Sequence, residues 1–361
     1  MIIKEQAIFS SFQTTRYQGS KRKLLPWIYQ IIKDIPFNSA LDGFGGTAAV
    51  SYLLKSMGKD VTFNDFLKFN SIIGTSIIEN SFIRLSEEEI ESILLNTDFG
   101  NNIINKTFKD SYYLEFENNW IERILVGINK FKGYNSQDTK YKKAIAFNAL
   151  FQSCIIKRPF NLFHRNNLYI RTNQVERSFG NKKTWDQDFE VYFKKFIKEI
   201  NNSIFDSGVI CKVENNDIFN LNEKLYDLVY LDPPYVLKNS KNESSNYLNC
   251  YHFLEGLSIY ESWLENIDFD TKTHRIKNST FPNYFKASIV NDTFKEIIKK
   301  YRQSIIVISY KYGGTPTIES IVNLLQAHGK LVSTYSLPYK YALNRQNGKS
   351  QLNREYLIIG K

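Results

Sequence analysis

The stretch that decides the fold is Leu228-Val229-Tyr230-Leu231, followed directly by Asp232-Pro233-Pro234-Tyr235. Four consecutive apolar residues predict a strand that is buried on both faces of a parallel sheet. The two prolines fix the backbone after this strand and remove two N–H donors, so the carbonyl groups there can only accept hydrogen bonds. Ligands of open parallel sheets bind beyond the carboxyl ends of the strands. Residues 232–235 are therefore the first candidate site.

A second pattern of strand, turn and helix begins at Ala40-Leu41. The run Asp42-Gly43-Phe44-Gly45-Gly46 predicts a tight turn, and the apolar residues between Val50 and Met57 share one face of a helix. Val61-Thr62-Phe63 predicts the next strand, which completes a βαβ unit. The glycines would let a nucleotide-like ligand approach the backbone of the turn. A plain tight turn and a phosphate-binding turn remain alternatives.

Two aspartates in this unit favour one kind of ligand. Asp42 ends the first strand, where its charge would repel a phosphate but could accept hydrogen bonds from an ammonium group. Asp65 follows the second strand about twenty residues later, where a carboxylate can accept hydrogen bonds from both hydroxyls of a ribose. No lysine-serine pair of the phosphate-binding type follows the turn, which disfavours an ATPase.

The order of patterns along the chain indicates the fold class. Apolar runs predict further strands at 305–308, 331–337 and 356–359, whereas residues 71–205 show helical periodicity. Alternating strands and helices indicate an α/β fold, with a doubly wound sheet covered by helices on both faces. We expect residues 1–70 and 206–361 to form one discontinuous domain and residues 71–205 to form an inserted, mainly helical domain.

One helix of the last third has marked ends in the sequence. Thr315 is a plausible N-cap, Pro316 fits the first helical position, and Gly329 is placed just past the end. We therefore expect a helix that starts at Pro316.

Charge and composition restrict the class of protein. Lysine and arginine outnumber aspartate and glutamate by 47 to 37, and the resulting net charge of +10 favours a polyanion such as nucleic acid as partner. The three cysteines form no CxxC pair, so neither a disulfide framework nor a metal site is predicted. No signal peptide and no apolar run of about 18 residues occur, so we expect a cytoplasmic protein outside the membrane.

The motif at 232–235 suits the methylation of an exocyclic amine. The Asp232 carboxylate and the Pro233 carbonyl could accept hydrogen bonds from both N–H groups, which frees the nitrogen lone pair to attack a sulfonium methyl group. No metal and no covalent intermediate are needed. Tyr235 offers a flat face for the target base, and a base that is paired in a duplex must be flipped out to reach it. A proline-rich turn without a catalytic role is the alternative.

Basic residues gather between positions 157 and 183, where seven lysines and arginines stand against one acid, Glu176. Arginine binds phosphate and also recognises guanine in the major groove, so this segment is expected to carry part of DNA recognition. The residues predicted to contact DNA are Arg158, Arg165, Arg171 and Arg177, together with Lys340 and Arg345 in a hairpin between the last two strands. A solvated basic face is the alternative.

These features together resemble the Dam-like adenine-N6 DNA methyltransferases of the alpha motif order, in which a target-recognition domain lies between the cofactor half and the catalytic motif. The resemblance covers residues 15–70 and about 205–361. It implies a Rossmann-like sheet, S-adenosylmethionine as the cofactor, and residues 71–205 as the target-recognition domain. It further implies double-stranded DNA as substrate and a role in a restriction-modification system with a separate cognate endonuclease.

The resemblance also implies roles for single residues. Tyr17, Lys21, Asp65 and Asp232 would contact the cofactor, the turn around Phe44 and Gly45 would enclose its methionine part, and Asp217 would help to hold its adenine. Two positions depart from the family pattern. Asp42-Gly43-Phe44-Gly45 stands where the family has Glu-Pro-Phe-x-Gly, and Ile218 stands where an aromatic residue is usual, a part that Phe219 could take.

Other functions remain open at this point. An aspartate at position 232 favours adenine over N4-cytosine, RNA or protein glutamine as target. A SAM-binding subunit without catalytic activity is disfavoured by the intact motif. For His252, a structural role is favoured over one near the target base.

Overall fold

The computed structural model describes residues 11–173, 182–222, 224–236, 246–277, 284–339 and 354–361. Within these ranges seven strands form one sheet in the order β3-β2-β1-β4-β5-β7-β6. The strands are β1 Ser39–Asp42, β2 Asp60–Asn64, β3 Lys212–Glu214, β4 Leu228–Leu231, β5 Ile305–Lys311, β6 Val332–Pro338 and β7 Arg354–Gly360. Strand β7 lies between β5 and β6 and is antiparallel to both, whereas the other paired strands are parallel.

The sheet places its two candidate motifs side by side. Strands β1 and β4 are neighbours in parallel register, with Asp42 opposite Tyr230. The chain leaves β1 toward β2 on one side, and β4 starts the other half of the sheet, so the strand order reverses between β1 and β4. Such a reversal is where open α/β sheets bind their ligands. The glycine turn and residues 232–235 therefore leave the sheet at the same edge.

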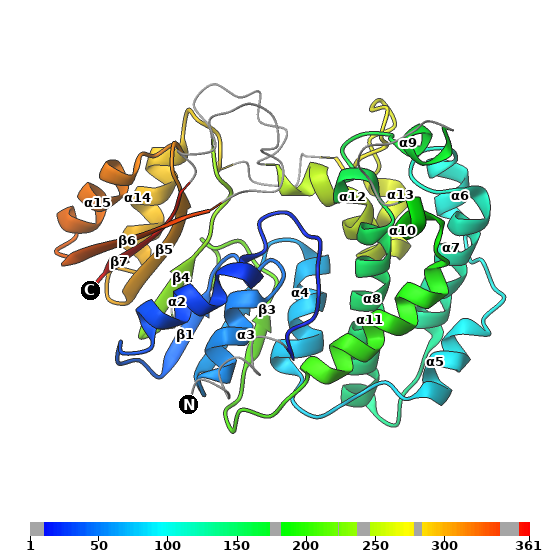
Figure 1. Cartoon of the computed structure of the whole chain (residues 1–361), viewed down its shortest axis with the longest axis horizontal. Helices are drawn as coiled ribbons and strands as arrows, with labels where there is room; N and C mark the ends of the chain where they lie inside the picture. Colours follow the sequence, from blue (N-terminus) through cyan, green and yellow to red (C-terminus); the bar gives the residue numbers. More distant parts are fainter. Residues whose placement is uncertain (1–10, 174–181, 223, 237–245, 278–283, 340–353) are drawn as a thin grey trace.

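Helices cover both faces of the sheet (Figure 1). Strand residues alternate between the two buried clusters: Leu228 and Tyr230 of β4 belong to one, and Val229 and Leu231 to the other. The first face is covered by α2 Leu25–Ile32 and α3 Ala49–Ser56, and the second by α14 Val290–Lys300 and α15 Ile318–Ala327. The predicted α/β class is confirmed, and full burial on both faces explains the uninterrupted apolar run of β4.

A second group of helices stands beside the sheet, at the right of Figure 1. Its members from the middle of the chain are α5 Glu87–Leu94, α6 Ile103–Phe108, α7 Glu115–Lys130, α8 Ser136–Ile156, η3 Pro159–Asn161, α9 Leu168–Thr172, α10 Lys182–Asp186 and α11 Phe189–Ser203. The short helix η2 Thr75–Glu79 contacts α3 and β3 as well as α8, and so connects this group to the sheet. Three elements from later in the chain join the group, α12 Tyr247–Ser258, η4 Tyr260–Ser262 and α13 Trp263–Asn266. The helical part is thus built from two separate stretches of sequence.

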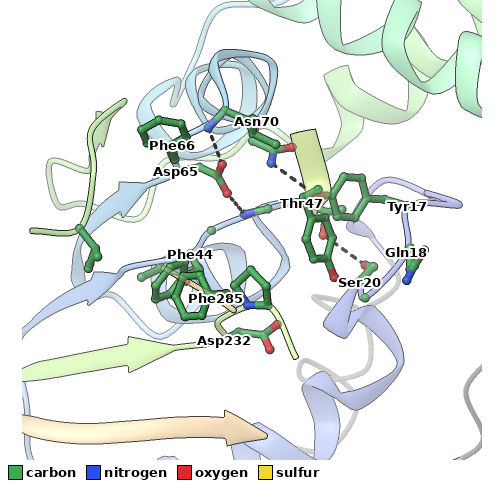
Figure 2. A pocket seen from close by; sticks show the side chains of 18 of the residues that line it. Tyr17, Gln18, Ser20, Phe44, Thr47, Asp65, Phe66, Asn70, Asp232 and Phe285 are labelled. Atoms are coloured by element: carbon green, nitrogen blue, oxygen red, sulfur yellow. Dashed lines mark hydrogen bonds between the residues drawn. The ribbon is translucent and has the colours of Figure 1, made fainter. Parts of the chain in front are cut away.

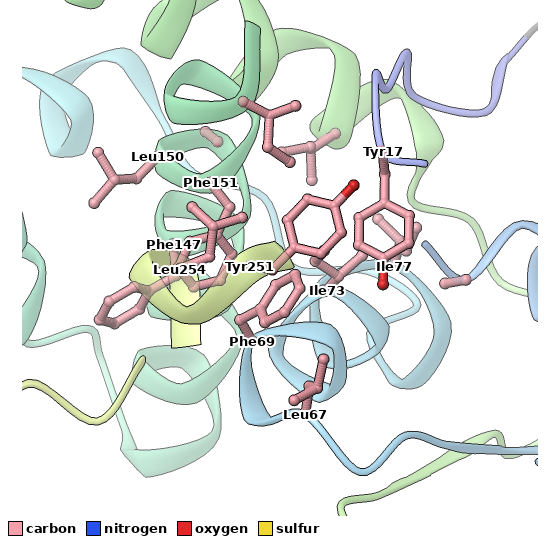
Figure 3. Close-up of a cluster of buried hydrophobic side chains, with 14 of the residues drawn as sticks. Tyr17, Leu67, Phe69, Ile73, Ile77, Phe147, Leu150, Phe151, Tyr251 and Leu254 are labelled. Carbon is pink, nitrogen blue, oxygen red and sulfur yellow. The ribbon is translucent and has the colours of Figure 1, made fainter. Parts of the chain in front are cut away.

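The helical part and the sheet share one hydrophobic core. Figure 3 shows the junction, where Phe69 of α4 (Lys68–Gly74) meets α8 and α12. The Phe69 ring lies 5.8 Å from the rings of both Phe151 and Tyr251, and 6.2 Å from that of Tyr17. Aromatic pairs at these separations stabilise a junction beyond the area that they bury. The assignment of residues 71–205 to target recognition stays a prediction.

The predicted start of the late helix is wrong. Helix α15 begins at Ile318, and the side chain of Thr317 caps it by accepting a hydrogen bond from the Ser320 amide at 3.2 Å. Thr315 instead pairs with Val236, donating its amide to the Val236 carbonyl at 2.8 Å. Thr315 therefore takes part in a β-bridge and does not cap the helix.

Candidate active site

A cavity of about 550 Å³ lies at the carboxyl ends of β1, β2 and β4. Figure 2 shows Tyr17, Phe44, Asp65 and Asp232 around it. The residues predicted for the cofactor all line this cavity: Tyr17, Lys21, Asp42, Phe44, Gly45, Asp65, Asp217 and Asp232. Pro234 of the catalytic motif lines it too, whereas Pro233 and Tyr235 lie outside the lining. The residues predicted from five separate segments of the sequence thus lie around one space.

Asp42 is a buried carboxylate without a cationic partner among the described residues. Its Oδ2 accepts hydrogen bonds from the amide and the hydroxyl of Ser51, at 3.1 and 2.7 Å. Burial raises the pKa of Asp42 to about 7, Ser51 opposes this rise, and the nearby carboxylate of Asp232 adds to it. A cationic ligand in the cavity would relieve this unfavourable charge.

Asp65 ties the glycine turn to the loop after β2. One carboxylate oxygen accepts a hydrogen bond from the Gly46 amide and the other from the Leu67 amide, both at 2.9 Å. Burial raises the pKa of Asp65, although these bonds oppose the rise. Each oxygen has a second lone pair, so the carboxylate can still accept bonds from a ligand.

The glycines of the turn are needed for packing. A Cβ on Gly45 would lie 2.1 Å from the Phe63 ring, and one on Gly43 would lie 2.9 Å from the Ile218 side chain. Gly46 has a φ of +50°, in the left-handed region that glycine adopts without strain. The turn is therefore glycine-rich because it lies close against its own protein neighbours, which differs from the ligand clearance inferred from the sequence.

Tyr17 forms an aromatic wall of the cavity together with α12. Its ring stacks on Tyr251, with centroids 4.4 Å apart and planes 10° apart, and lies 5.8 Å from Tyr247. The Gln18 amide donates to the Tyr251 hydroxyl at 2.7 Å. Burial raises the pKa of Tyr17 well above its usual value, so its hydroxyl stays neutral. The N-terminal loop is thereby fixed to a helix more than two hundred residues later in the chain.

Lys21 binds directly to the catalytic motif. Its ammonium donates to Asp232 Oδ1 at 2.8 Å and to the Tyr235 hydroxyl at 2.7 Å. Burial by itself would lower the pKa of Lys21, but the carboxylates of Asp232 and Glu355 raise it well above the usual value. The lysine is therefore a permanent cation that holds one oxygen of Asp232 in place.

Two aromatic residues of the cavity carry no local sequence signal. Phe66 and Phe285 line it, and the Phe285 ring meets the Phe44 ring edge to face at 5.5 Å. The family's aromatic position after Asp217 is filled by Ile218, which lines the cavity, while Phe219 packs against Tyr284 at 4.8 Å. Phe219 does not line the cavity, whereas Phe66, Tyr284 and Phe285 do.

The predicted DNA-binding residues divide into three groups. Arg158 and Arg171 are 1% and 8% exposed. Arg158 donates to the carbonyls of Leu162 and Arg165, and Arg171 donates to Glu117 at 2.7 Å. Both guanidinium groups lie inside the protein in this structure, which argues against the prediction that Arg158 and Arg171 contact DNA.

Some of the remaining basic residues are exposed, and the others lie outside the residues that the structure describes. Arg165 is exposed, as are Lys182 and Lys183 of α10. Arg177, Lys340 and Arg345 lie outside the described residues. A DNA contact at Arg165, Arg177, Lys340 and Arg345 stays a prediction.

His252 has a structural environment. It is fully buried, its Nε2 lies 2.8 Å from the Tyr112 hydroxyl and 3.1 Å from the Phe163 carbonyl, and burial lowers its pKa to about 3. It does not line the cavity. The structural role favoured from the sequence agrees with this position.

The sheet order, the ligand cavity at its reversal point and the motif at 232–235 define an α/β enzyme of the methyltransferase class. The family model described as D12 class N6 adenine-specific DNA methyltransferase matches residues 17–313. The chain therefore belongs to this family and is an enzyme that methylates adenine N6 in DNA. No helix within the described ranges is long and apolar enough to cross a membrane.

Two curated relatives extend over nearly the whole chain. Type II methyltransferase M2.HphI of Haemophilus parahaemolyticus is 24% identical over 357 residues, which cover 96% of this chain and 97% of the relative. Modification methylase StsI of Streptococcus sanguinis is 26% identical over 367 residues, which cover 95% of this chain and 51% of the relative. The chain thus spans about half the length of StsI.

Proposed function

We propose that this chain transfers the methyl group of S-adenosylmethionine to N6 of an adenine that is flipped out of double-stranded DNA. The observation that carries the proposal is the single cavity lined by Asp42, Asp65, Asp217 and Asp232, with the last of these supplied by the motif at 232–235. Four carboxylates in one cavity suit a ligand with cationic groups and a ribose.

The lining of the cavity fits S-adenosylmethionine in three respects. Its volume of about 550 Å³ lies in the range of roughly 300–1,000 Å³ common for small-molecule sites. Asp42 would neutralise the ammonium group and Asp65 would accept bonds from the ribose, while Phe44 and Phe285 supply apolar surface. When bound, S-adenosylmethionine supplies an electrophilic methyl group on a sulfonium.

Asp232 and Pro233 would act on the target amine. A carboxylate and a carbonyl that accept its two N–H groups draw the nitrogen toward tetrahedral geometry and aim its lone pair. Lys21 holds Oδ1 of Asp232, so the orientation of the carboxylate is set before the substrate arrives. Pro234 keeps the segment rigid at the cavity, and the Tyr235 ring would stack on the flipped base, a contact of about 1–3 kcal/mol.

The surroundings of the site support DNA as the partner. The net charge is +10, and Arg165, Lys182 and Lys183 place exposed basic groups on the helical part. Residues 71–205 would recognise the target sequence, with Arg177, Lys340 and Arg345 as further contacts. The names of the relatives, a type II methyltransferase and a modification methylase, support membership of a restriction-modification system, in which a separate endonuclease would cut the same sequence.

Replacing Asp232 tests this proposal. Asp232→Ala should lower methyl transfer to DNA by at least about 10²-fold, because a preorganised acceptor for the reacting amine is lost. Binding of S-adenosylmethionine by calorimetry should remain measurable, since most of the cavity lining is unchanged. Sequencing that detects modified bases in DNA from a host expressing each variant identifies the methylated base and its position.

A matched control is Asp292→Ala, which removes an exposed aspartate from the first turn of α14. Its turnover should equal that of the wild-type chain. Turnover of Asp232→Ala close to wild type would refute the catalytic role of the motif.

A further inference from the structure

A second buried carboxylate, Glu355, lies behind the catalytic motif. Glu355 is near the start of β7 and pairs across the sheet with Lys311 of β5. It is 0% exposed and does not line the cavity, so it cannot contact a ligand there. Because it lies more than a hundred residues after Asp232 in the chain, no local sequence motif connects the two residues.

Three donors converge on one oxygen of Glu355. Its Oε1 accepts hydrogen bonds from the Tyr235 hydroxyl at 2.8 Å and from the Ser309 hydroxyl at 2.7 Å, and it lies 3.3 Å from the Lys21 ammonium. Tyr235 and Lys21 are also the two groups that bond to Asp232 Oδ1, at 2.9 and 2.8 Å. Glu355 therefore contacts the same two groups that bond to Asp232.

This arrangement constrains how the Tyr235 hydroxyl is used. A hydroxyl has one proton, and here it lies within bonding distance of two carboxylates, those of Asp232 and Glu355. When Glu355 accepts that proton, Asp232 keeps acceptor capacity for the target amine. The same bond fixes the phenol, whose ring is also braced edge to face by Tyr310 at 5.3 Å.

The negative charge of Glu355 also bears on the electrostatics of the reaction. The Lys21 ammonium lies beside both Asp232 and Glu355, and Lys311, which pairs with Glu355 across the sheet, is a second cation near Glu355. Positive charge develops on N6 when the amine attacks the sulfonium methyl group, and a nearby negative charge in a buried site stabilises it. The other titratable groups facing Glu355 are Tyr230 and Tyr339.

We propose that Glu355 is a positioning residue for methyl transfer, which orients Tyr235 and Lys21 so that Asp232 presents a free acceptor to the target amine. The proposal rests on the catalytic role proposed above for Asp232. It adds a residue outside both the motif and the cavity.

The decisive variant is Glu355→Gln, which keeps the shape of the side chain and removes its charge. We expect kcat to fall by at least about 10-fold, as misplaced reacting groups do, while the Kd for S-adenosylmethionine changes little. Glu355 helps to raise the pKa of Asp232, together with burial and against Lys21. Because Asp232 must be ionised to accept the amine, the acid limb of the kcat profile should move to lower pH in the variant.

Two further variants make the result specific. Glu355→Asp keeps the charge but withdraws it by one methylene, so its acid limb should stay at the wild-type pH with kcat several-fold lower. Glu296→Gln removes an exposed carboxylate of α14 and should match the wild-type chain in kcat, Kd and pH profile.

Each outcome decides the proposal. A wild-type kcat and acid limb in Glu355→Gln would overturn it, as would a loss of kcat that is matched by the loss of cofactor affinity with an unmoved acid limb. If Glu355→Gln does not fold, Glu355→Asp decides, because a wild-type kcat there would contradict a positioning role. An inactive Asp232→Ala beside a normal Glu355→Gln refutes Glu355 alone, whereas an active Asp232→Ala refutes the catalytic motif itself.

Discussion

The cavity at the sheet and the helical part both bury carboxylates, but they neutralise them differently. Glu117 of α7 lies 2.7 Å from both the Lys157 ammonium and the Arg171 guanidinium. Burial would raise its pKa, and these cations lower it. Among the described residues Asp42 in the cavity accepts hydrogen bonds only from Ser51, and burial raises its pKa to about 7. A buried charge matched by protein cations supports the fold, whereas one without such a match among the described residues indicates a cationic ligand.

Of the buried arginines of the helical part, Arg171 follows the first pattern through Glu117, whereas Arg158 is held by aromatic rings and backbone carbonyls. The Arg158 guanidinium lies 4.5 Å from the centre of the Tyr112 ring and 5.4 Å from that of Phe163, and it donates to two backbone carbonyls. Burial lowers its pKa to about 10, so it is still a cation at neutral pH. These contacts shape the loop that runs from Arg158 to Arg165. Arg158 is a structural residue inside a segment that reads as a DNA-binding surface.

The largest expected effect comes from removing this arginine. Arg158→Ala should lower the free energy of unfolding by about 3 kcal/mol or more, because it leaves a cavity and breaks bonds from a charged donor. Chemical denaturation measures this loss. The salt dependence of DNA binding should keep its slope, since no phosphate contact is removed. Unchanged stability combined with a flatter salt dependence would restore Arg158 as a DNA contact and break the comparison.

The sequence predicts those residues of the site whose position follows from the local pattern of strands and turns. Asp42 ends β1, and Asp65 and Asp232 directly follow β2 and β4. Because parallel strands of one sheet end at one edge, these three positions predict one cavity. Tyr251 and Glu355 belong to the same site through contacts between elements far apart in the chain. Helix periodicity and strand alternation do not specify such contacts.

The basic segment shows the opposite limit of sequence reasoning. Counting charges between residues 157 and 183 does not tell which side chains face solvent. Arg158 is buried because Tyr112, far upstream, provides an aromatic surface for it, and Arg171 because Glu117 provides a carboxylate. Arg165 has the same charge and lies exposed a few residues away. Only tertiary packing separates these three arginines.

A smaller effect is expected when the unmatched charge of the cavity is removed. Asp42→Asn should weaken binding of S-adenosylmethionine by about 10- to 100-fold at pH 8, the loss expected for a charged hydrogen bond. In the wild-type chain, binding of a cation requires ionised Asp42, so affinity should fall as the pH drops below about 7. Calorimetry across pH 5.5–8 should show a slope reduced by about one proton in the variant.

The sign of the accompanying stability change sharpens the same test. Asp42 has a raised pKa, so the folded state binds its proton more tightly than the unfolded state, and this contribution to stability is lost as pH rises from about 4 through 7. Asp42→Asn should therefore stabilise the ligand-free protein at pH 8. Glu255→Gln is the control, because the pKa of Glu255 is also about 7 but its carboxylate binds the Lys68 and Phe69 amides outside the cavity. If the affinity of Asp42→Asn for S-adenosylmethionine kept the full pH dependence of the wild-type chain, Asp42 would not be the group that binds the cationic part of the ligand.

The smallest effect belongs to the exposed arginine of the basic segment. Arg165→Ala should leave the free energy of unfolding within about 0.5 kcal/mol of wild type, as surface substitutions do. It should weaken DNA binding several-fold and lower the slope of log K against log salt by about 1, the value for one lost phosphate contact. Lys182→Ala and Lys183→Ala provide the same measurement on α10. Substitution of Arg158 would then change the stability of the fold, and substitution of Arg165 the salt dependence of DNA binding. If the slope of log K against log salt were unchanged in all three exposed variants, DNA recognition would have to lie outside this segment.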